Sequence, residues 1–434
     1  MNVLERAECL LDAGSSGNMN FTVIASYRGC LEPPVLQSAL AALQAEHQLL
    51  RSTLEWQGNH CHFVPTAAAV PISVLPGPGA GDDEQDGAPE GMAASEAWKP
   101  ATMAALRQRF EGGGEPLWRL SWLRGAAAGE LLLTFHHAIA DGLSSMALVQ
   151  RLFSLLAAAA AGVVPSPQPE WDAFMPDLAR TFAGSVADPQ AACAAAAVVN
   201  QPVGLLSDRQ DLGLTTSYGL EQISAPASGA LLAWTRQRGL RLNATLHAAF
   251  LQALVAEGAL PAQTTATTVV NLRPLASPAL PWELMRLLRV CVDTPVLVDP
   301  EAPLELLAAQ LHGELQLQLE AGAPLQALAA IEAALRDNPS PQQLWRRSWR
   351  QGGLITNLGR VPVMAEHGPF RLERLFFVAN VEPIALPDRP LAVLGALSFN
   401  GELSLTSFQI EQQLSDQRAA AVMAAMKQRL LALV

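Results

Sequence analysis

The most constraining feature of the sequence is a short segment in which an apolar strand pattern meets a helix at two histidines. Residues 130–137 have strand composition, and from Gly142 onward the apolar residues recur with a helical period. Asp141 stands where a helix N-cap is expected. The junction has the pattern H-H-x-x-x-D-G, which ordinary residue frequencies produce by chance in such a chain with a probability on the order of 10⁻³. The segment therefore predicts a strand, a turn and a capped helix.

The residue types at this junction suit acid–base chemistry. A neutral imidazole can accept a proton from a hydroxyl or an amine and return it to a leaving group, as acyl transfer from a thioester requires. Adjacent residues of a strand point to opposite faces, so only one of His136 and His137 is expected to face a substrate, and alternation does not choose between them. Gly142 would allow close approach beside the helix N-terminus. The structural alternative is a packed histidine pair beside a capping aspartate.

Composition excludes several classes of protein. In 434 residues, 28 basic and 40 acidic side chains give a net charge of −12, which disfavours nucleic acid as a partner. Half the residues are hydrophobic and only 16% are charged, as in a globular chain. The N-terminus has acids where a signal peptide needs basic residues, and we expect no transmembrane segment. Five scattered cysteines without a C-x-x-C pair fit reduced thiols in the cytoplasm.

The remaining periodicity predicts a mixed chain of strands and helices in both halves. Helical patterns cover residues 36–51, 243–258, 303–319, 324–335 and the C-terminus from about 415. Strand patterns cover residues 21–28, 117–124, 264–273, 353–358, 372–378, 391–399 and 402–410. Asn243 is expected to cap its helix, and Asn400-Gly401 predicts a two-residue hairpin. Residues 76–91 lack apolar periodicity and predict a surface loop, and residues 184–216 favour a crossover between the halves.

With these residues, the sequence resembles the superfamily of condensation domains and CoA-dependent acyltransferases, whose signature is H-H-x-x-x-D-G. The resemblance implies that His137 is the catalytic base and that His136, Asp141 and Gly142 support the motif. It also implies an ion pair between Asp141 and Arg273, since Val269-Val270-Asn271-Leu272-Arg273-Pro274 resembles the strand that carries the family's arginine. The helix from Leu36, the helix from Asn243 and the strand Thr356-Asn357-Leu358-Gly359-Arg360 extend the resemblance over most of the chain. Asn357 and Ser144 are expected to line the substrate tunnel.

The family fold implies two chloramphenicol-acetyltransferase-like subdomains of mixed α and β structure, in a V-shaped pseudo-dimer with a tunnel between them. We expect an N-terminal subdomain at 1–184, a crossover linker at 185–216 and a C-terminal subdomain at 217–434. The resemblance is strongest to stand-alone polyketide-associated or alcohol acyltransferases. These would move an acyl group from an acyl carrier protein or CoA to an alcohol, in the cytoplasm, as a monomer, without a metal or organic cofactor.

Three other functions stay open at this stage. Amide-forming condensation in nonribosomal peptide synthesis would use the same histidine on an amine acceptor. A non-catalytic homologue that holds a carrier protein or lipid is suggested by the absence of the family's D-F-G-W-G motif. A metal-dependent hydrolase is a third possibility, raised by His60-Cys61-His62, although no second ligand pair stands at zinc spacing.

Several other residues favour structural roles. His247, His312 and His367 stand apart from one another and are expected in packing or on the surface. No G-x-S-x-G is present, which disfavours a serine nucleophile on a hydrolase elbow. Trp118 and Trp122 alternate on one strand face and are expected in the core, with the wall of a lipid tunnel as the alternative.

Overall fold

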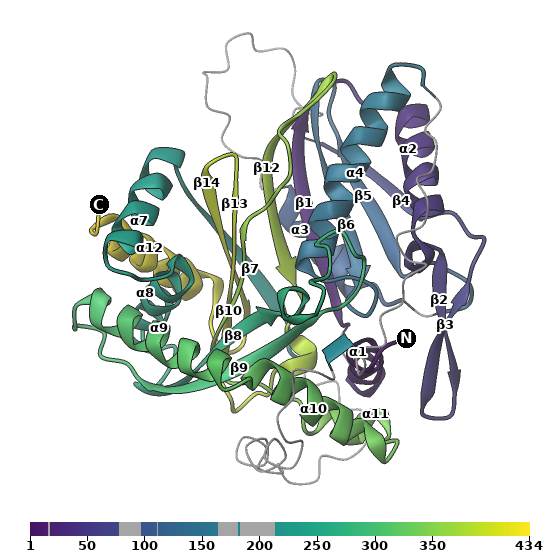
Figure 1. Cartoon of the computed structure of the whole chain (residues 1–434). Coiled ribbons are helices and arrows are strands. Elements are labelled where there is room, and N and C mark those ends of the chain that lie inside the picture. The colour runs from purple at the N-terminus through teal and green to yellow at the C-terminus, as the bar shows by residue number, and fades with distance from the viewer. Residues whose placement is uncertain (16–17, 78–96, 111, 164–180, 183–212) are drawn as a thin grey trace.

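The computed structural model describes residues 1–15, 18–77, 97–110, 112–163, 181–182 and 213–434. Its strands form two large sheets and a small hairpin, with helices on their outer faces (Figure 1). The mixed α and β fold class and the division into two sheet-rich halves are confirmed. The expected linker at 185–216 lies almost entirely outside the described residues, as does the expected loop from residue 78 onward. The domain boundaries therefore stay a prediction.

The first half is built on a mainly antiparallel sheet. In spatial order it contains β11 (Glu366–His367), β12 (Phe370–Ala379), β1 (Asn20–Arg28), β6 (Ala128–His136), β5 (Trp118–Arg124) and β4 (Ile72–Pro76). The helices of this half are α1 (Val3–Gly14), α2 (Pro33–Glu46), α3 (Trp98–Arg107) and α4 (Gly142–Ala160). A separate hairpin consists of β2 (Ser52–Gln57) and β3 (His60–Pro65). Because β11 and β12 come from the C-terminal part of the sequence, the two halves are interlocked.

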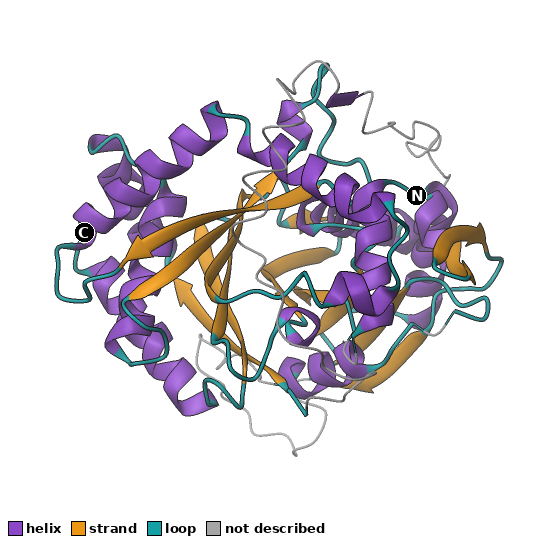
Figure 2. Cartoon of the chain, turned by 90° about the horizontal axis from the view of Figure 1, so that it is seen from below, coloured by secondary structure: helices purple, strands orange, loops and turns teal. Residues whose placement is uncertain are grey.

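The second half has its own six-stranded sheet. In spatial order it contains β7 (Thr216–Ile223), β14 (Glu402–Ile410), β13 (Leu391–Phe399), β10 (Gly352–Arg360), β8 (Gln263–Asn271) and β9 (Arg289–Leu297). Its helices are α7 (Ala225–Gln237), α8 (Leu242–Ala256), α9 (Leu304–Glu320), α10 (Ala323–Arg336), α11 (Pro341–Trp345) and α12 (Asp416–Leu431). Figure 2 shows that α7, α8, α9 and α12 lie along the outer edge and that the strands lie toward the middle of the molecule. Short 3₁₀ turns occur at Gln48–Arg51, Arg273–Leu275 and Glu382–Ile384.

Local sequence signals account for several of these elements. The hairpin between β13 and β14 turns at Asn400 and Gly401, whose φ angles of 51° and 84° meet the positive-φ requirement of a type I′ turn. Trp118 and Trp122 are buried in the core of the first half, where their indole N–H groups donate to Leu50 O and Tyr27 Oη. These tryptophans are core residues, as the alternation predicts.

The long apolar helix α4 belongs to the core. By length and composition it could cross a bilayer, and no other described helix meets both criteria. However, 56% of its most apolar window is buried inside the molecule, and α4 packs on α2. The burial fits a core helix of the first half.

Three local expectations are wrong. The helix predicted over 36–51 ends at Glu46, because the backbone of His47 is extended (φ −124°, ψ 120°), and a 3₁₀ turn follows. Asn243 does not cap α8, which begins at Leu242 after Arg241. Arg273 does not lie on a strand, since β8 ends at Asn271 and the chain turns there.

Candidate active site

The histidine pair lies at the end of β6, in the interior of the first sheet. His136 is the last residue of the strand, and its backbone N–H donates to Leu117 O at 2.9 Å. His137 opens the following turn, and its N–H donates to Met19 O at 2.7 Å. The backbone of each histidine is thus held by a different neighbouring segment, which places the two rings in different surroundings.

The His137 ring is set up to accept a proton. Its Nδ1 lies 2.9 Å from Ala140 O, and because a carbonyl oxygen only accepts, Nδ1 is the protonated nitrogen. Nε2 is then the basic nitrogen. The ring stacks obliquely on Phe21, with centroids 4.8 Å apart, and it is only partly buried. Burial, and next the charge of Arg289, hold the pKa of His137 below its ordinary value, so the imidazole is neutral at neutral pH.

His136 has a different environment. It is fully buried, and its Nδ1 accepts the backbone N–H of Ala138 at 3.1 Å. Its Nε2 faces the Asp12 carboxylate of α1 at 3.8 Å. The His136 ring is thus enclosed between the turn and α1, whereas the His137 ring is only partly buried. The two rings lie in different surroundings, and the catalytic role of His137 stays a prediction.

Asp141 joins the motif to the second half. Its carboxylate accepts from Arg273 Nη1 at 2.6 Å, from Arg273 Nη2 at 3.2 Å and from the backbone N–H of Leu288 at 3.0 Å. The expected ion pair is therefore present, and both partners are buried. Burial alone would raise the pKa of Asp141, but the Arg273 charge and the N–H donors outweigh it and lower that pKa.

The same carboxylate caps α4. The Ser144 N–H donates to Asp141 Oδ1 at 3.0 Å, and the Ser144 hydroxyl accepts the Asp141 N–H at 3.0 Å, which completes a reciprocal capping box. Ser144 is fully buried. The expectation that Ser144 lines the tunnel is wrong, because its hydroxyl is engaged with Asp141.

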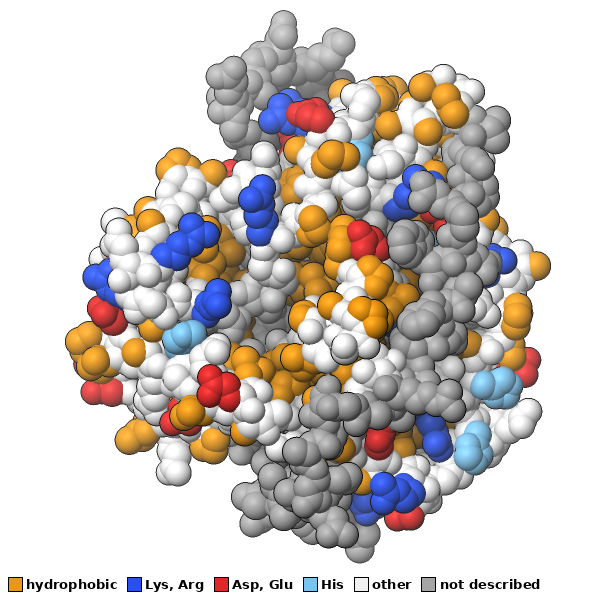
Figure 3. Space-filling model, in the orientation of Figure 1, with side chains coloured by type: hydrophobic (Ala, Val, Ile, Leu, Met, Phe, Trp, Pro, Cys, Tyr) orange, Lys and Arg blue, Asp and Glu red, His pale blue; other side chains and the backbone are white. Residues whose placement is uncertain are grey.

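Gly142 permits a close contact between the halves. A Cβ at this position would lie 2.6 Å from Cδ2 of Leu358 on β10. The space that the sequence suggests for a substrate or backbone is thus taken by the Leu358 side chain. Figure 3 shows apolar side chains gathered where the halves meet. Leu358, which lies on β10 of the second half, therefore packs directly against the motif turn.

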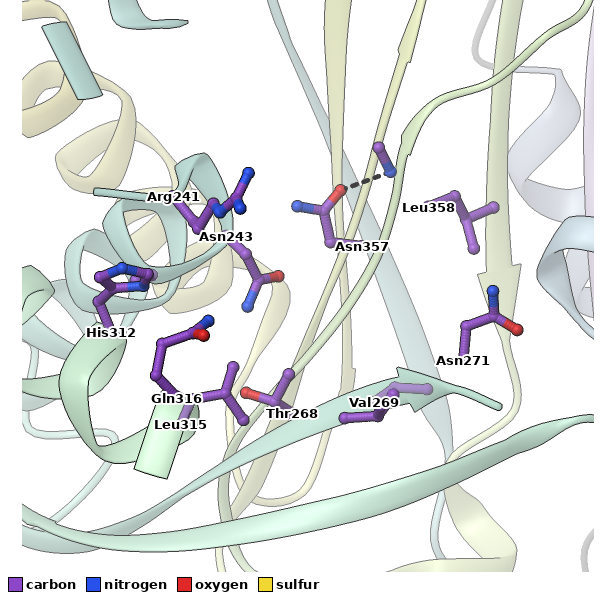
Figure 4. Close-up of a pocket in the computed structure, with 13 residues that line it drawn as sticks. Arg241, Asn243, Thr268, Val269, Asn271, His312, Leu315, Gln316, Asn357 and Leu358 are labelled. Atoms are coloured by element: carbon purple, nitrogen blue, oxygen red, sulfur yellow. Dashed lines mark hydrogen bonds between the residues drawn. The ribbon is translucent and has the colours of Figure 1, made fainter. Parts of the chain in front are cut away.

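A cavity of about 330 Å³ lies on the other side of Leu358. It is open to solvent and is lined by residues of α8, α9, β8 and β10, among them Asn357, Leu358 and Asn271 (Figure 4). Asn271 Oδ1 also accepts from the backbone N–H of Arg273 at 3.1 Å. The predicted tunnel residue Asn357 thus faces a cavity that is linked to the motif through Leu358 and Asn271.

Sequence reasoning missed an ion pair beside the histidine. Arg289, at the start of β9, donates to Glu8 of α1 at 2.7 Å, and both charges act on His137. The two residues are 281 positions apart. The signal that could have found Glu8 is its helical spacing with Leu4 and Leu11, which places an acid on the buried face of α1.

Of the other histidines, His312 lines the cavity, whereas His247 and His62 are not among its lining residues. His247 is buried in α8 and its Nε2 bonds with Gly353 O, while His62 lies on the β2–β3 hairpin. Within the described ranges, no three His, Cys, Asp or Glu side chains are grouped so that they could hold a metal ion.

Comparison with protein families gives two matches, one in each half. The Condensation domain model matches residues 10–175, and the model of the phthiocerol/phthiodiolone dimycocerosyl transferase C-terminus matches residues 216–408. Two curated relatives are peptide synthetases. A probable non-canonical nonribosomal peptide synthetase, CymA of Salinispora arenicola, is 29% identical over 262 residues, which are 57% of this chain and 3% of that protein. Cyclosporin synthetase of Tolypocladium inflatum is 33% identical over 146 residues, 32% of this chain and 1% of that protein.

Solved structures with the same fold cover almost the whole chain. Polyketide synthase associated protein 5 from Mycobacterium tuberculosis has a TM-score of 0.64 at 18% identity, over 97% of this chain and 96% of that one. The trichothecene 15-O-acetyltransferase of Fusarium sporotrichioides has a TM-score of 0.71 at 13% identity, over 99% and 93%. The first condensation domain of the CDA synthetase has a TM-score of 0.67 at 13% identity, over 100% and 95%. With both halves matched and the motif in place, the chain belongs to the superfamily of condensation domains and CoA-dependent acyltransferases and is a transferase.

Proposed function

We propose that the protein is an O-acyltransferase, which moves an acyl group from a thioester to a hydroxyl, with His137 as the general base. The observation that carries the proposal is the geometry of His137. Ala140 O holds the protonated Nδ1, so the unprotonated Nε2 is the nitrogen available to a substrate. The low pKa of the ring keeps that nitrogen free of a proton at neutral pH.

The proposed reaction needs no covalent intermediate on the protein. His137 Nε2 takes the proton of the acceptor hydroxyl as the oxygen attacks the thioester carbonyl carbon. The tetrahedral intermediate collapses, the C–S bond breaks, and the proton passes from Nε2 to the thiolate. The products are an ester and a free thiol. His136, Asp141 and Arg273 hold the turn, because together they fix both ends of the motif.

We further propose that the acyl donor is an acyl carrier protein or CoA thioester, and that the enzyme acts in the cytoplasm, where these donors are made. The similarity to a polyketide-associated protein and to peptide synthetases supports a carrier-bound donor. The chain covers only 3% and 1% of those two synthetases, so their activities are not transferred to it.

Amide formation is the second candidate function. It is favoured by the Condensation domain match over residues 10–175 and by the similarity to the two peptide synthetases. The chemistry at His137 would be the same, with an amine in place of the hydroxyl. The acceptor class separates the two candidates.

The test is thiol release from a panel of acyl-CoA and acyl-carrier thioesters with alcohol or amine acceptors. We expect release that depends on an alcohol and that falls at least about 100-fold in His137→Ala, the scale of a lost general base. His62→Ala is the matched control, because His62 lies on the β2–β3 hairpin. Circular dichroism of each variant reports folding.

Each outcome has a distinct meaning. Release that depends on an amine alone would replace the ester reaction by condensation. Undiminished release in His137→Ala would remove that histidine from the mechanism. Thioester binding without turnover in any pairing would contradict the transferase proposal and favour a homologue that only holds its ligand.

A further inference from the structure

The cavity behind Leu358 has a polar end that the proposed function does not explain. This end is formed by Arg241 and Asn243 at the start of α8 and by His312 and Gln316 of α9 (Figure 4). In the same view, Leu358 and Asn271 lie at the opposite end. The volume of about 330 Å³ is at the lower limit of small-molecule sites, about 300 to 1,000 Å³. The cavity therefore has room for a small ligand with two different ends.

The polar end is rich in hydrogen-bond donors and contains no acid. None of the residues that line the cavity is Asp or Glu. The Asn357 Oδ1 accepts the backbone N–H of Gly359 at 2.8 Å, which leaves its amide NH₂ free to donate into the cavity. Arg241 is exposed at the rim and contributes a permanent positive charge.

Arg241 differs from the other arginines near the site. Arg273, Arg286, Arg289 and Arg350 each form an ion pair with a carboxylate of this chain. Arg241 has no ion-pair partner among the residues that the structure describes. A guanidinium that faces a cavity without a carboxylate is complementary to an anionic ligand. In a chain with a net charge of −12, such a local cation makes this point selective for an anionic ligand.

The other end of the cavity leads to the motif. Leu358 lines the cavity and also fills the space beside Gly142. Asn271 lines it and bonds to Arg273, the partner of Asp141. A ligand whose anionic group lies at Arg241 would therefore direct its other end toward the turn that holds His137.

We propose that this cavity binds the anionic end of a substrate, a carboxylate or a phosphate ester, with Arg241 as the charged donor and Asn243, Gln316 and Asn357 as neutral donors. The inference rests on the proposed acyl transfer and deepens it, since it assigns a charge to one substrate. The anionic group could belong to the acceptor, as in a hydroxy acid, or to the donor, as in a phosphopantetheine thioester. Both sources share the chemistry that Arg241 recognises.

Two matched pairs of probes distinguish the sources. For the acceptor, 3-hydroxybutyrate is compared with its methyl ester, and for the donor, acetyl-phosphopantetheine is compared with acetyl-pantetheine. Binding is measured by calorimetry on His137→Ala, so that no turnover occurs, and KM is measured on the enzyme with intact His137. In one of the two pairs, we expect Arg241→Gln to weaken binding of the anionic probe at least about tenfold. Binding of the neutral probe of that pair should be unchanged. Arg241→Lys should retain part of the preference.

Arg236→Gln is the control, because Arg236 lies on α7 and does not line the cavity. The pair that responds to Arg241→Gln identifies the substrate that carries the anion. An equal response of the anionic and neutral probes in both pairs would overturn the proposal, as would a His137→Ala protein with intact Arg241 that binds none of the four probes. Charge-selective binding without turnover would contradict the acyltransferase reaction but not the cavity assignment. Turnover without charge selectivity would contradict the cavity assignment but not the acyltransferase reaction.

Discussion

At the scale of single residues, the protonation of His137 is the central property of the site. Its pKa is lowered first by burial and then by Arg289, while Glu8 and Asp141 act in the opposite direction. A general base is active only when unprotonated, so activity is present above this pKa and is lost as the pH falls through it. We therefore expect the acid limb of the kcat/KM profile to lie below about pH 6.5, the ordinary value for histidine.

Changing the neighbouring charges should move this limb in opposite directions. Arg289→Gln removes a cation and leaves Glu8 unpaired, so the pKa of His137 rises and the limb shifts to higher pH. Glu8→Gln leaves Arg289 without its counter-charge, so the pKa of His137 falls further and the acid limb shifts to lower pH. The measurement is kcat/KM against pH for both variants, with the exposed Arg371→Gln as control. Shifts in the same direction would show that the pair does not act through charge.

At the scale of elements, Asp141 has two functions that substitutions can separate. It caps α4, and it neutralises Arg273 at the end of β8. Asn is as good an N-cap as Asp, whereas Ala is not. Asp141→Asn therefore tests the ion pair, and Asp141→Ala tests the ion pair and the cap together.

We expect Asp141→Asn to lower the free energy of unfolding by about 3 to 5 kcal/mol, because Arg273 stays buried without its partner. Asp141→Ala should lower it by about 1 kcal/mol more. Urea unfolding measures both values. Glu366→Ala, which breaks an exposed pair with Arg371, should cost less than about 1 kcal/mol. Equal values for Asn and Ala would mean that the cap does not stabilise α4.

The contact between Gly142 and Leu358 gives another prediction at this scale. In Gly142→Ala the new Cβ would lie 2.6 Å from Leu358 Cδ2, so Leu358 must move. We expect a severalfold increase in KM for the substrate that occupies the cavity, without loss of stability, since Ala is the better helix former. Leu358→Ala in the same chain should restore KM. Gly229→Ala is the control, because nothing lies within 4 Å of its Cβ. An unchanged KM in Gly142→Ala would contradict the proposed link between the motif turn and the cavity through Leu358.

At the scale of the whole molecule, segments far apart in the sequence hold the halves together. β12 pairs with β1 in the first sheet, and the Thr406 hydroxyl of β14 donates to Phe377 O of β12 at 2.9 Å. Helix α1 contributes two ion pairs to the second half, Glu5 with Arg286 and Glu8 with Arg289. The relative position of the halves, and hence the site, depends on these contacts.

The pair of Glu5 and Arg286 is buried on both sides, which allows a test of this attachment. Arg286→Met should lower the free energy of unfolding by about 3 to 5 kcal/mol, because a buried carboxylate is left without its cation. Adding Glu5→Gln should recover most of this loss, since Gln keeps the capping box of α1. Urea unfolding of the single and double variants measures both effects. A double variant as unstable as Arg286→Met would contradict the explanation.

The pH dependence of this effect follows from the raised pKa of Glu5. Burial raises it in the folded protein, although Arg286 opposes the increase. The folded state therefore holds the proton more tightly than the unfolded state, and stability is lost as the pH rises through the folded pKa. Without Arg286 the pKa rises further, so the loss in Arg286→Met should be smaller at about pH 5 than at about pH 8.

The sequence by itself determined the features that depend on neighbours along the chain. The strand, turn and capped helix around His137 and the hairpin at Asn400-Gly401 follow from side-chain alternation, capping and positive φ, which are local effects. The identity of the protonated nitrogen of His137 required the structure, because a turn brings Ala140 O to Nδ1. The end of α2 also required the structure, which shows extended backbone at His47 and the indole N–H of Trp118 donating to Leu50 O.

Only the tertiary structure decided which distant groups meet. Glu8 and Arg289 are separated by 281 residues, and β12 enters the first sheet from the other half of the chain. The cavity beside Arg241 exists because α8, α9, β8 and β10 come together around it. Such contacts arise from packing among many segments, and no periodicity or spacing within one segment specifies which partner a buried charge will find.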